Sequence, residues 1–223
     1  MSRARPSAPR FACLAAGALF LGLVTPALVA AAPQAPAIDP WRALTELRLH
    51  LAASGALGAK FRQSYVPAGF ATGDEETGRV ALALPDCLRW DYSEPYPKAY
   101  LLCGSRLHTW VTGEPQGERL HVEARDEAGL DLLLLPVEQL QERYRAVAKV
   151  AAGGAIDVEL VPTDPGSRIA QAQITFDLAS QRPTALAYRD RDGNRSSFRF
   201  EAFESVGDAT LFTPPSTLIW KEP

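Results

Sequence analysis

Apolar positions along the chain follow two different periods. They first recur at helical spacing, at Trp41, Leu44, Leu47 and Leu51. This spacing predicts an amphipathic helix of about four turns. Asp39 and Pro40 supply an N-cap and a proline at the first helical position, and Gly55 is a natural stop. From residue 80 the period changes to two, which is the period of a β-strand with one apolar face.

Short alternating segments make up much of the remaining chain. They cover residues 80–84, 88–92, 98–103, 106–112, 156–160, 172–178 and 198–200. Turn signals separate several of these segments, at Gly153-Gly154, Asp164-Pro165-Gly166 and Asp192-Gly193-Asn194. Short strands joined by hairpin turns indicate an antiparallel sheet with one solvent-exposed face. The predicted fold class is therefore mainly β with helices.

Two segments fit this alternation less well. Residues 129–141 (GLDLLLLPVEQLQ) are apolar and then helical, and Pro136 predicts a short helix that is kinked or broken there. Residues 142–151 could continue this helix by composition, but their apolar residues alternate, at Tyr144, Ala146, Ala148 and Val150. We favour a strand paired through Gly153-Gly154 with residues 156–161, because a two-glycine turn needs a strand on each side.

The stretch LRWDYSEPYP, residues 88–97, places large aromatic side chains on a predicted strand. Trp90 and Tyr92 point to one face, and Arg89 and Asp91 to the other. A sheet face with large apolar residues can be an ordinary core beneath the helices, or it can line a cavity. The pattern alone leaves both open for the set Trp90, Tyr92, Phe176, Phe198 and Phe200.

The first 32 of the 223 residues have the features of an export signal. Three arginines precede an apolar run from Phe11 to Ala30, and small residues follow it. A membrane anchor is the alternative, but Gly17, Gly22 and Pro26 interrupt the run. We expect cleavage near residues 30–32, a linker at 33–38 and a single domain at 39–223.

Charge argues against a nucleic-acid partner. The whole chain carries a formal charge of −3, and loss of the three signal arginines would leave 20 basic against 26 acidic residues, or −6. Nucleic-acid binding draws on a basic surface, and a mildly acidic chain is a poor candidate for it.

Cys87 and Cys103 would remain after export to an oxidising compartment. If the strand that ends at Tyr92–Ser93 turns through Pro95-Tyr96, the two cysteines lie nearly opposite each other in one hairpin. Two unrelated buried thiols are the alternative. We favour a disulfide, which stabilises on the order of 3 kcal/mol in the loop-entropy model.

Motifs for catalysis or metal binding are absent from the sequence. His50, His108 and His121 form no His-x-x-x-His pair, and no Cys-x-x-Cys occurs. There is no Gly-x-Ser-x-Gly elbow and no phosphate-cradling glycine loop. We therefore expect no enzyme activity and no cofactor, and a hydrolase is a distant alternative.

Several motifs, in order along the chain, resemble the periplasmic outer-membrane lipoprotein carrier family, LolA. The resemblance covers residues 61–215, and each motif is weak alone while the ordered set is fairly specific. The motifs are Phe61-Arg62-Gln63, Gly78-Arg79-Val80-Ala81-Leu82 with Pro85, Leu88-Arg89-Trp90-Asp91-Tyr92 with Pro95, Gly104 with Leu107, Asp192 through Phe198, and Leu211-Phe212-Thr213-Pro214-Pro215.

The resemblance implies a single-domain, strongly curved antiparallel sheet, an incomplete β-barrel covered by a helical lid that encloses an apolar cavity. It implies a monomeric periplasmic carrier that binds the acyl chains of lipoproteins and moves them from the inner to the outer membrane. An inner-membrane ABC-type releasing complex and an outer-membrane acceptor would be its partners. The lipid-binding residues would be Phe61, Val80, Leu82, Leu84, Leu88, Trp90, Tyr92, Trp110, Leu133, Leu135, Phe176, Phe198 and Phe200.

Two departures from the family pattern bear on the release mechanism and the cargo. Leu84 stands where family members often carry an arginine that latches the lid. Cys103-Gly104 and His108 replace the common Asp-Gly and tryptophan, with Trp110 two residues later on the same strand face. A LolA-like carrier of another lipid, or a module that senses lipid or lipoprotein, is therefore the alternative function.

Overall fold

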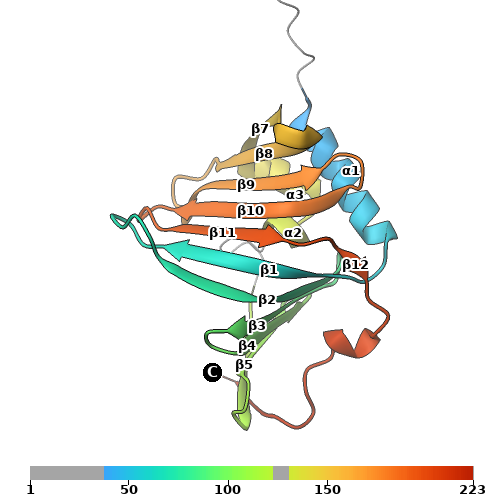
Figure 1. Ribbon diagram of the computed structural model, residues 1–223, viewed down its shortest axis with the longest axis vertical. Coiled ribbons are helices and arrows are strands. Elements are labelled where there is room, and N and C mark those ends of the chain that lie inside the picture. The colour runs from blue at the N-terminus through green and yellow to red at the C-terminus, as the bar shows by residue number, and fades with distance from the viewer. Residues whose placement is uncertain (1–37, 123–130, 223) are drawn as a thin grey trace, which may run out of the picture. The chain divides into compact units, whose positions relative to one another are not determined.

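The computed structural model describes residues 38–122 and 131–222, without the side chains of Asp131, Leu133, Ala152 and Ala209. These residues belong to one compact unit, Pro36–Pro223. The unit is built on a single open, curved sheet with helices on one side, which lie behind the sheet in Figure 1.

The sheet contains 13 strands in the order β13-β6-β5-β4-β3-β2-β1-β11-β10-β9-β8-β7, with β12 paired to β1. Neighbouring strands are antiparallel except β13 and β6, which are parallel. The strands are β1 (Leu57–Val66), β2 (Asp74–Ala83), β3 (Cys87–Glu94), β4 (Lys98–Cys103), β5 (Arg106–Val111), β6 (Gln116–His121), β7 (Tyr144–Val150), β8 (Ala155–Pro162), β9 (Ile169–Asp177), β10 (Arg182–Asp190), β11 (Arg195–Phe200), β12 (Glu204–Ser205) and β13 (Ile219–Lys221). The antiparallel β architecture predicted from the alternation is confirmed.

Helix α1 (Pro40–Ala53) forms as its sequence predicts. The Asp39 carboxylate accepts hydrogen bonds from the backbone N–H groups of Trp41, at 2.9 Å, and Arg42, at 3.3 Å, so it caps two free donors of the first turn. The helix ends before Gly55, whose φ of 69° suits glycine. Its apolar face is buried against the sheet, at Leu44, Leu47 and Leu51.

The ambiguous segment after residue 130 divides into two short helices and a strand. Helix α2 (Asp131–Leu134) and helix α3 (Val137–Arg143) are separated at Pro136, as predicted. Strand β7 follows at once and pairs with β8, with Ala148 opposite Val158, so the choice of a strand over a longer helix is confirmed. The short 3-10 turn η2 (Ala152–Gly154) joins β7 to β8.

The C-terminal segment covers the other side of the sheet near β3 to β6. The short 3-10 helix η3 (Ala209–Phe212) contacts β3, and the Leu211 carbonyl accepts a 2.7 Å hydrogen bond from Arg89. Trp220 on β13 packs against His108 of β5, with ring centroids 4.9 Å apart. Strands β4 and β5 have buried side chains on both faces, at Leu101 and Leu102 and at Leu107 and His108.

Candidate functional site: an aromatic face beneath helices

The helix-covered face of the sheet carries the large apolar side chains that the alternation predicted. Residues directly opposite in the register share a face, and Val80 lies opposite Trp90 while Leu82 lies opposite Leu88. Seven of the predicted residues are buried in one continuous cluster, and their exposed fractions are 0 to 6%: Phe61, Val80, Leu82, Leu88, Trp90, Phe176 and Phe198.

Aromatic rings from five strands form a continuous row on this face. Trp90 on β3 lies between Phe61 and Phe198, with centroids 4.9 and 5.0 Å away. Tyr188 on β10 extends the row by stacking on Phe198 at 6.4 Å. Aromatic pairs at these separations stabilise by about 0.5–1.5 kcal/mol beyond their burial. The large side chains of the stretch 88–97 therefore serve to build this aromatic row.

The other end of the row is polar. Tyr92 lies 5.0 Å from Phe61 and 5.8 Å from Tyr100, and its hydroxyl donates a 2.6 Å hydrogen bond to Oε1 of Gln63. Lys98 lies over the Tyr92 ring at 4.7 Å and is paired with Glu76 at 2.6 Å. Burial, followed by the charge of Glu76, raises the pKa of Tyr92. The phenol therefore stays protonated and keeps its hydrogen bond.

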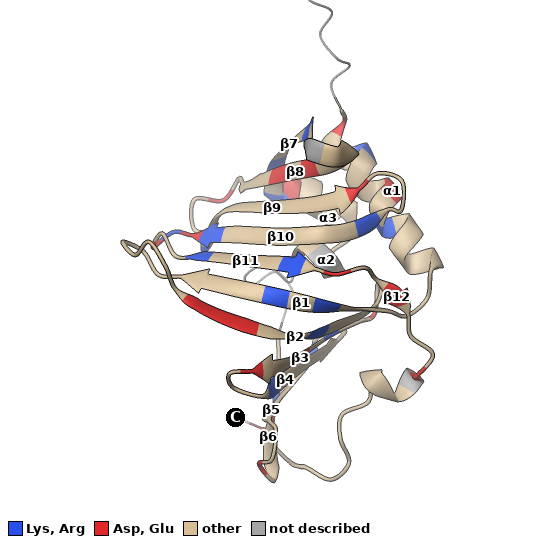
Figure 2. Ribbon diagram, viewed as in Figure 1, with Lys and Arg blue, Asp and Glu red and all other residues tan. Residues whose placement is uncertain are grey.

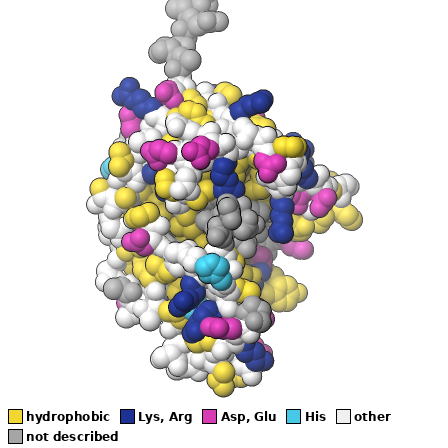
Figure 3. Space-filling model, turned by 180° about the vertical axis from the view of Figure 1, so that it is seen from behind, with side chains coloured by type: hydrophobic (Ala, Val, Ile, Leu, Met, Phe, Trp, Pro, Cys, Tyr) yellow, Lys and Arg dark blue, Asp and Glu magenta, His cyan; other side chains and the backbone are white. Residues whose placement is uncertain are grey.

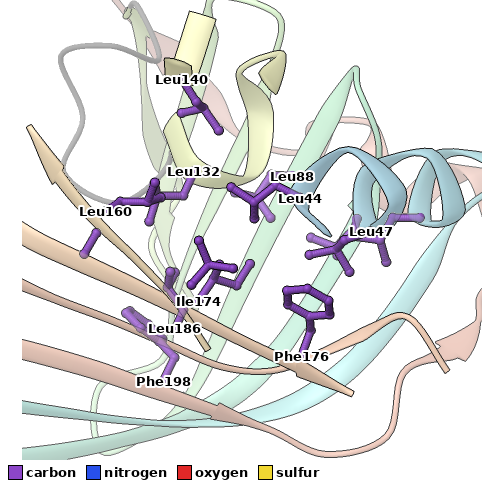
Figure 4. Packing of buried hydrophobic residues seen from close by; sticks show 14 of the residues in the cluster. Leu44, Leu47, Leu88, Leu132, Leu140, Leu160, Ile174, Phe176, Leu186 and Phe198 are labelled. Carbon is purple, nitrogen blue, oxygen red and sulfur yellow. The ribbon is translucent and has the colours of Figure 1, made fainter. Parts of the chain in front are cut away.

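The helices close the face by apolar packing. Figure 4 shows Leu132 and Leu140 from α2 and α3, and Leu44 and Leu47 from α1, directed toward side chains of the sheet such as Phe176. Leu132 and Leu140 are 4% and 1% exposed. Side chains of the helices and of the sheet pack together in one cluster here. The cavity expected beneath the helices stays a prediction.

Apart from Trp110, the remaining predicted residues divide into two groups. Leu84, Leu135, Tyr92 and Phe200 are partly buried and pack against the cluster from its margin. The side chain of Leu133 lies outside the described residues.

In Figure 3, which views the molecule from behind Figure 1, hydrophobic side chains reach the surface among charged ones.

The placement expected for Trp110 is wrong. Trp110 pairs with Ala99, which pairs with Asp91, so it lies on the opposite face of the sheet from Trp90. There it packs against Trp220, with centroids 6.0 Å apart, and beneath the guanidinium of Arg89 at 5.3 Å. Alternation shows which residues of a strand share a face, but it does not show which face lies beneath the helices. Here both faces of the sheet carry buried residues, so the pattern could not assign Trp110 to one of them.

Sequence reasoning also missed two members of the aromatic row, Tyr100 and Tyr188. Tyr100 lies directly opposite Trp90, and Tyr188 shares a face with Leu186. Both tyrosines stand two residues from a buried leucine, Leu102 and Leu186, and this local alternation was the signal that could have found them.

Cys87 and Cys103 form a disulfide, as predicted. They are directly opposite each other on β3 and β4, with Cα atoms 4.2 Å apart. The bond joins the ends of the hairpin that presents Trp90, Tyr92 and Tyr100. It therefore fixes the register of the strands that carry half of the aromatic row.

Within residues 38–122 and 131–222, no group of three or more histidine, cysteine, aspartate or glutamate side chains could hold a metal ion. In the same residues, no helix has both the length and the apolar character needed to cross a membrane.

Comparison with known proteins assigns the family. A sequence model of the outer membrane lipoprotein carrier protein LolA matches residues 53–215. The chain belongs to the LolA family. An outer-membrane lipoprotein carrier protein of Chromobacterium violaceum is 31% identical over 103 residues, which is 46% of this chain and 42% of the relative. The chain thus matches less than half of that relative's length.

A solved structure shows the same fold. This conserved, uncharacterized protein of Thermus thermophilus aligns over 83% of this chain and 100% of its own, with a TM-score of 0.52 at 12% identity. A putative outer membrane lipoprotein-sorting protein domain from Vibrio parahaemolyticus aligns over 78% of this chain and 95% of its own, with a TM-score of 0.48 at 12% identity.

Membership of the LolA family gives the chain a carrier or lipoprotein-sorting fold, and members of this family are carriers rather than enzymes. Leu84 is half-buried against the apolar cluster, and an arginine elsewhere, Arg48 on α1, donates a 3.0 Å hydrogen bond to the Leu134 carbonyl of α2.

Proposed function

We propose that the aromatic face binds the acyl chains of lipoproteins and that the protein carries them through the periplasm from the inner to the outer membrane. The observation that carries the proposal is the aromatic row beneath a helical cover. A row of rings offers wide apolar surface without a fixed polar contact. Each methylene of an acyl chain that leaves water for such a surface contributes about 0.8 kcal/mol, so chains of different length can bind.

Binding requires the cover to move, because Trp90 is 6% exposed and Phe176 is fully buried. Helices α2 and α3 are 4 and 7 residues long. Helices this short are not stable by themselves in water and depend on the contacts they make. Their contacts with the sheet are apolar and non-directional, so an acyl chain can replace them at the same surface. We infer that α2 and α3 form the lid, and that the cargo occupies the space their leucines fill.

The cellular compartment and the partners of the protein follow from the proposal. The signal at residues 1–32 would export the chain to the periplasm, where the protein acts as a monomer. A membrane complex of the ABC type would load it, and an acceptor at the outer membrane would receive the cargo. A free lipid in place of a lipoprotein, or sensing in place of transport, would use the same face.

Binding of a fluorescent acylated peptide tests the proposal, with the same peptide lacking the acyl chain as the blank. Tyr92→Glu places a carboxylate at the half-buried end of the row and should weaken binding by about tenfold or more, because lipid solvates a charge poorly. Val111→Glu is the matched control, since Val111 is 54% exposed. Equal binding of the acylated and unacylated peptides by the wild type would refute the proposal. Competition by free phospholipid at the same site would assign the carrier to another lipid.

A further inference from the structure

Cations gather on the face of the sheet opposite the helices. A hollow of about 450 Å³ lies over β11, β1 and β2, and four basic residues line it: Lys60, Arg62, Arg79 and Arg199. All four are exposed. Figure 2 shows the blue segments of β11, β1 and β2 next to one another across the sheet. The whole chain has a formal charge of −3, so this positive surface is a local feature.

The strand register brings like charges together. Lys60 on β1 lies directly opposite Arg79 on β2, and Arg62 on β1 lies directly opposite Arg199 on β11. Like charges directly opposite in a sheet are destabilising. An anion between the strands would remove this repulsion.

Two of the four cations are neutralised within the protein. Lys60 is 3.9 Å from Glu201, and Arg62 is 2.9 Å from Glu75. Arg79 lies opposite Asp91, but Arg89 already holds both oxygens of that carboxylate, at 2.7 and 2.8 Å. Among the described residues, Arg79 and Arg199 have no ion pair.

Hydroxyl groups line the same hollow. Ser93 donates a 3.1 Å hydrogen bond to the backbone carbonyl of Thr77, and the two side-chain oxygens lie 3.5 Å apart. A hollow of about 300–1,000 Å³ is the size of a small-molecule site. Guanidinium groups bind phosphate through paired N–H donors, and hydroxyls add single donors.

We propose that this hollow binds phosphate-bearing anions through Arg79 and Arg199. The four basic side chains lie on the opposite face of the sheet from the aromatic row, and Phe61 and Phe200 also contribute to the lining of the hollow. Two sources have the required chemistry, a soluble phosphate compound and the phosphodiester head group of an anionic lipid. Both present oxygens that two guanidiniums can share.

The test uses four probes at low ionic strength, where exposed charges are screened least, and one of them is polyglutamate, an anion without phosphate. Pyrophosphate is titrated by calorimetry, and vesicles of phosphatidylglycerol with phosphatidylcholine are compared with vesicles of phosphatidylcholine alone in co-sedimentation. Arg79→Ala/Arg199→Ala should weaken binding of the anionic probe by about tenfold or more, the loss expected for charge-assisted hydrogen bonds. Arg79→Lys/Arg199→Lys keeps the charge and should recover only part of the affinity.

Arg145→Ala/Arg168→Ala is the matched control. Both residues are exposed, neither lines the hollow, and the change in net charge is the same. If the Arg79→Ala/Arg199→Ala variant loses binding of pyrophosphate but not of vesicles, the ligand is a soluble phosphate. If it loses binding of vesicles but not of pyrophosphate, the ligand is the lipid head group. Equal loss in the control variant, absence of binding to either anionic probe, or equally tight binding of polyglutamate would overturn the proposal.

Discussion

The guanidinium of Arg48 on α1 donates a hydrogen bond of 3.0 Å to the carbonyl oxygen of Leu134, the last residue of α2. A helix end leaves carbonyl groups without partners inside the helix, and a basic side chain can satisfy them. The long helix that is anchored by Leu44, Leu47 and Leu51 thus holds the short helix of the proposed lid. This polar contact adds direction to a cover that otherwise depends on leucine packing.

Arg48→Ala should loosen the proposed lid. Loss of a half-buried hydrogen bond from a charged donor costs about 1–2 kcal/mol, and hydrogen exchange across residues 131–143 should quicken. Arg42→Ala on the same helix is the control, because the Arg42 side chain is 78% exposed and pairs with Glu46 one turn away. Unchanged exchange in Arg48→Ala would show that α2 does not depend on this contact.

Cargo should loosen the same segment. If the leucines of α2 and α3 give up the aromatic face to an acyl chain, amides of residues 131–143 lose protection when an acylated peptide is added. Amides of β9, which lies in the sheet, should not change and serve as the internal reference. Identical protection of residues 131–143 with and without the peptide would contradict a moving cover.

Trp90→Ala should destabilise the fold by about 3–5 kcal/mol, because it removes a large side chain that contacts Phe61 and Phe198 in the buried cluster. Trp90→Glu would also bury an unpaired charge and should prevent folding. Trp110→Ala provides a matched tryptophan on the other face, where the ring is half-buried, and should cost less. Chemical denaturation measures all three variants, and equal losses for Trp90→Ala and Trp110→Ala would count against a special role for the row.

Removal of the disulfide should lower stability by about 3 kcal/mol, since the bond closes a loop with a sequence separation of 16. The double variant Cys87→Ser/Cys103→Ser should unfold at lower denaturant than the wild type. Added reductant should shift the wild type to the same midpoint and leave the variant unchanged. Peptide mapping without reductant should recover the linked peptides, and two free thiols in exported protein would contradict the bond.

Stability should fall in mild acid because of His108. Burial, followed by the charges of Arg119 and Arg106, lowers the pKa of His108. Below about pH 6.5 the unfolded chain binds a proton that the folded protein does not. The free energy of unfolding therefore has its full value above this pH, and it decreases as the pH falls toward the lowered pKa of His108.

His108→Gln should flatten this dependence in denaturation curves between about pH 5 and 8. His50→Gln, at an exposed position on α1, should leave it as in the wild type. The proposed role of His108 is wrong if both variants keep the full slope.

Local patterns predicted the elements whose signals lie within one segment. The cap at Asp39, the break at Pro136 and the alternation through Leu88, Trp90 and Tyr92 each depend on a few neighbouring residues, and all appear as predicted. The disulfide followed from simple pairing across one hairpin. The family motifs then supplied the curvature and the helical cover, which no local period contains.

Other features depend on partners distant in sequence. Strand β13 has three residues, and it exists because it lies in parallel beside β6. The wrong face for Trp110 has the same origin. Leu101 and His108 are buried on one side of the β4–β5 hairpin, where Trp220 packs against His108, and Leu102 is buried on the other side. A two-residue period cannot identify the core side of strands that are apolar on both.

The sheet divides the four tryptophans of the chain into two pairs. Trp90 lies in the apolar cluster and Trp41, on α1, packs against it, while Trp110 and Trp220 contact each other on the opposite face. Intrinsic fluorescence can therefore be split by face. A form that keeps Trp41 and Trp90 reports optically on entry of a ligand beneath the helices. A form that keeps Trp110 and Trp220 reports on the docking of the C-terminal segment, without any added label.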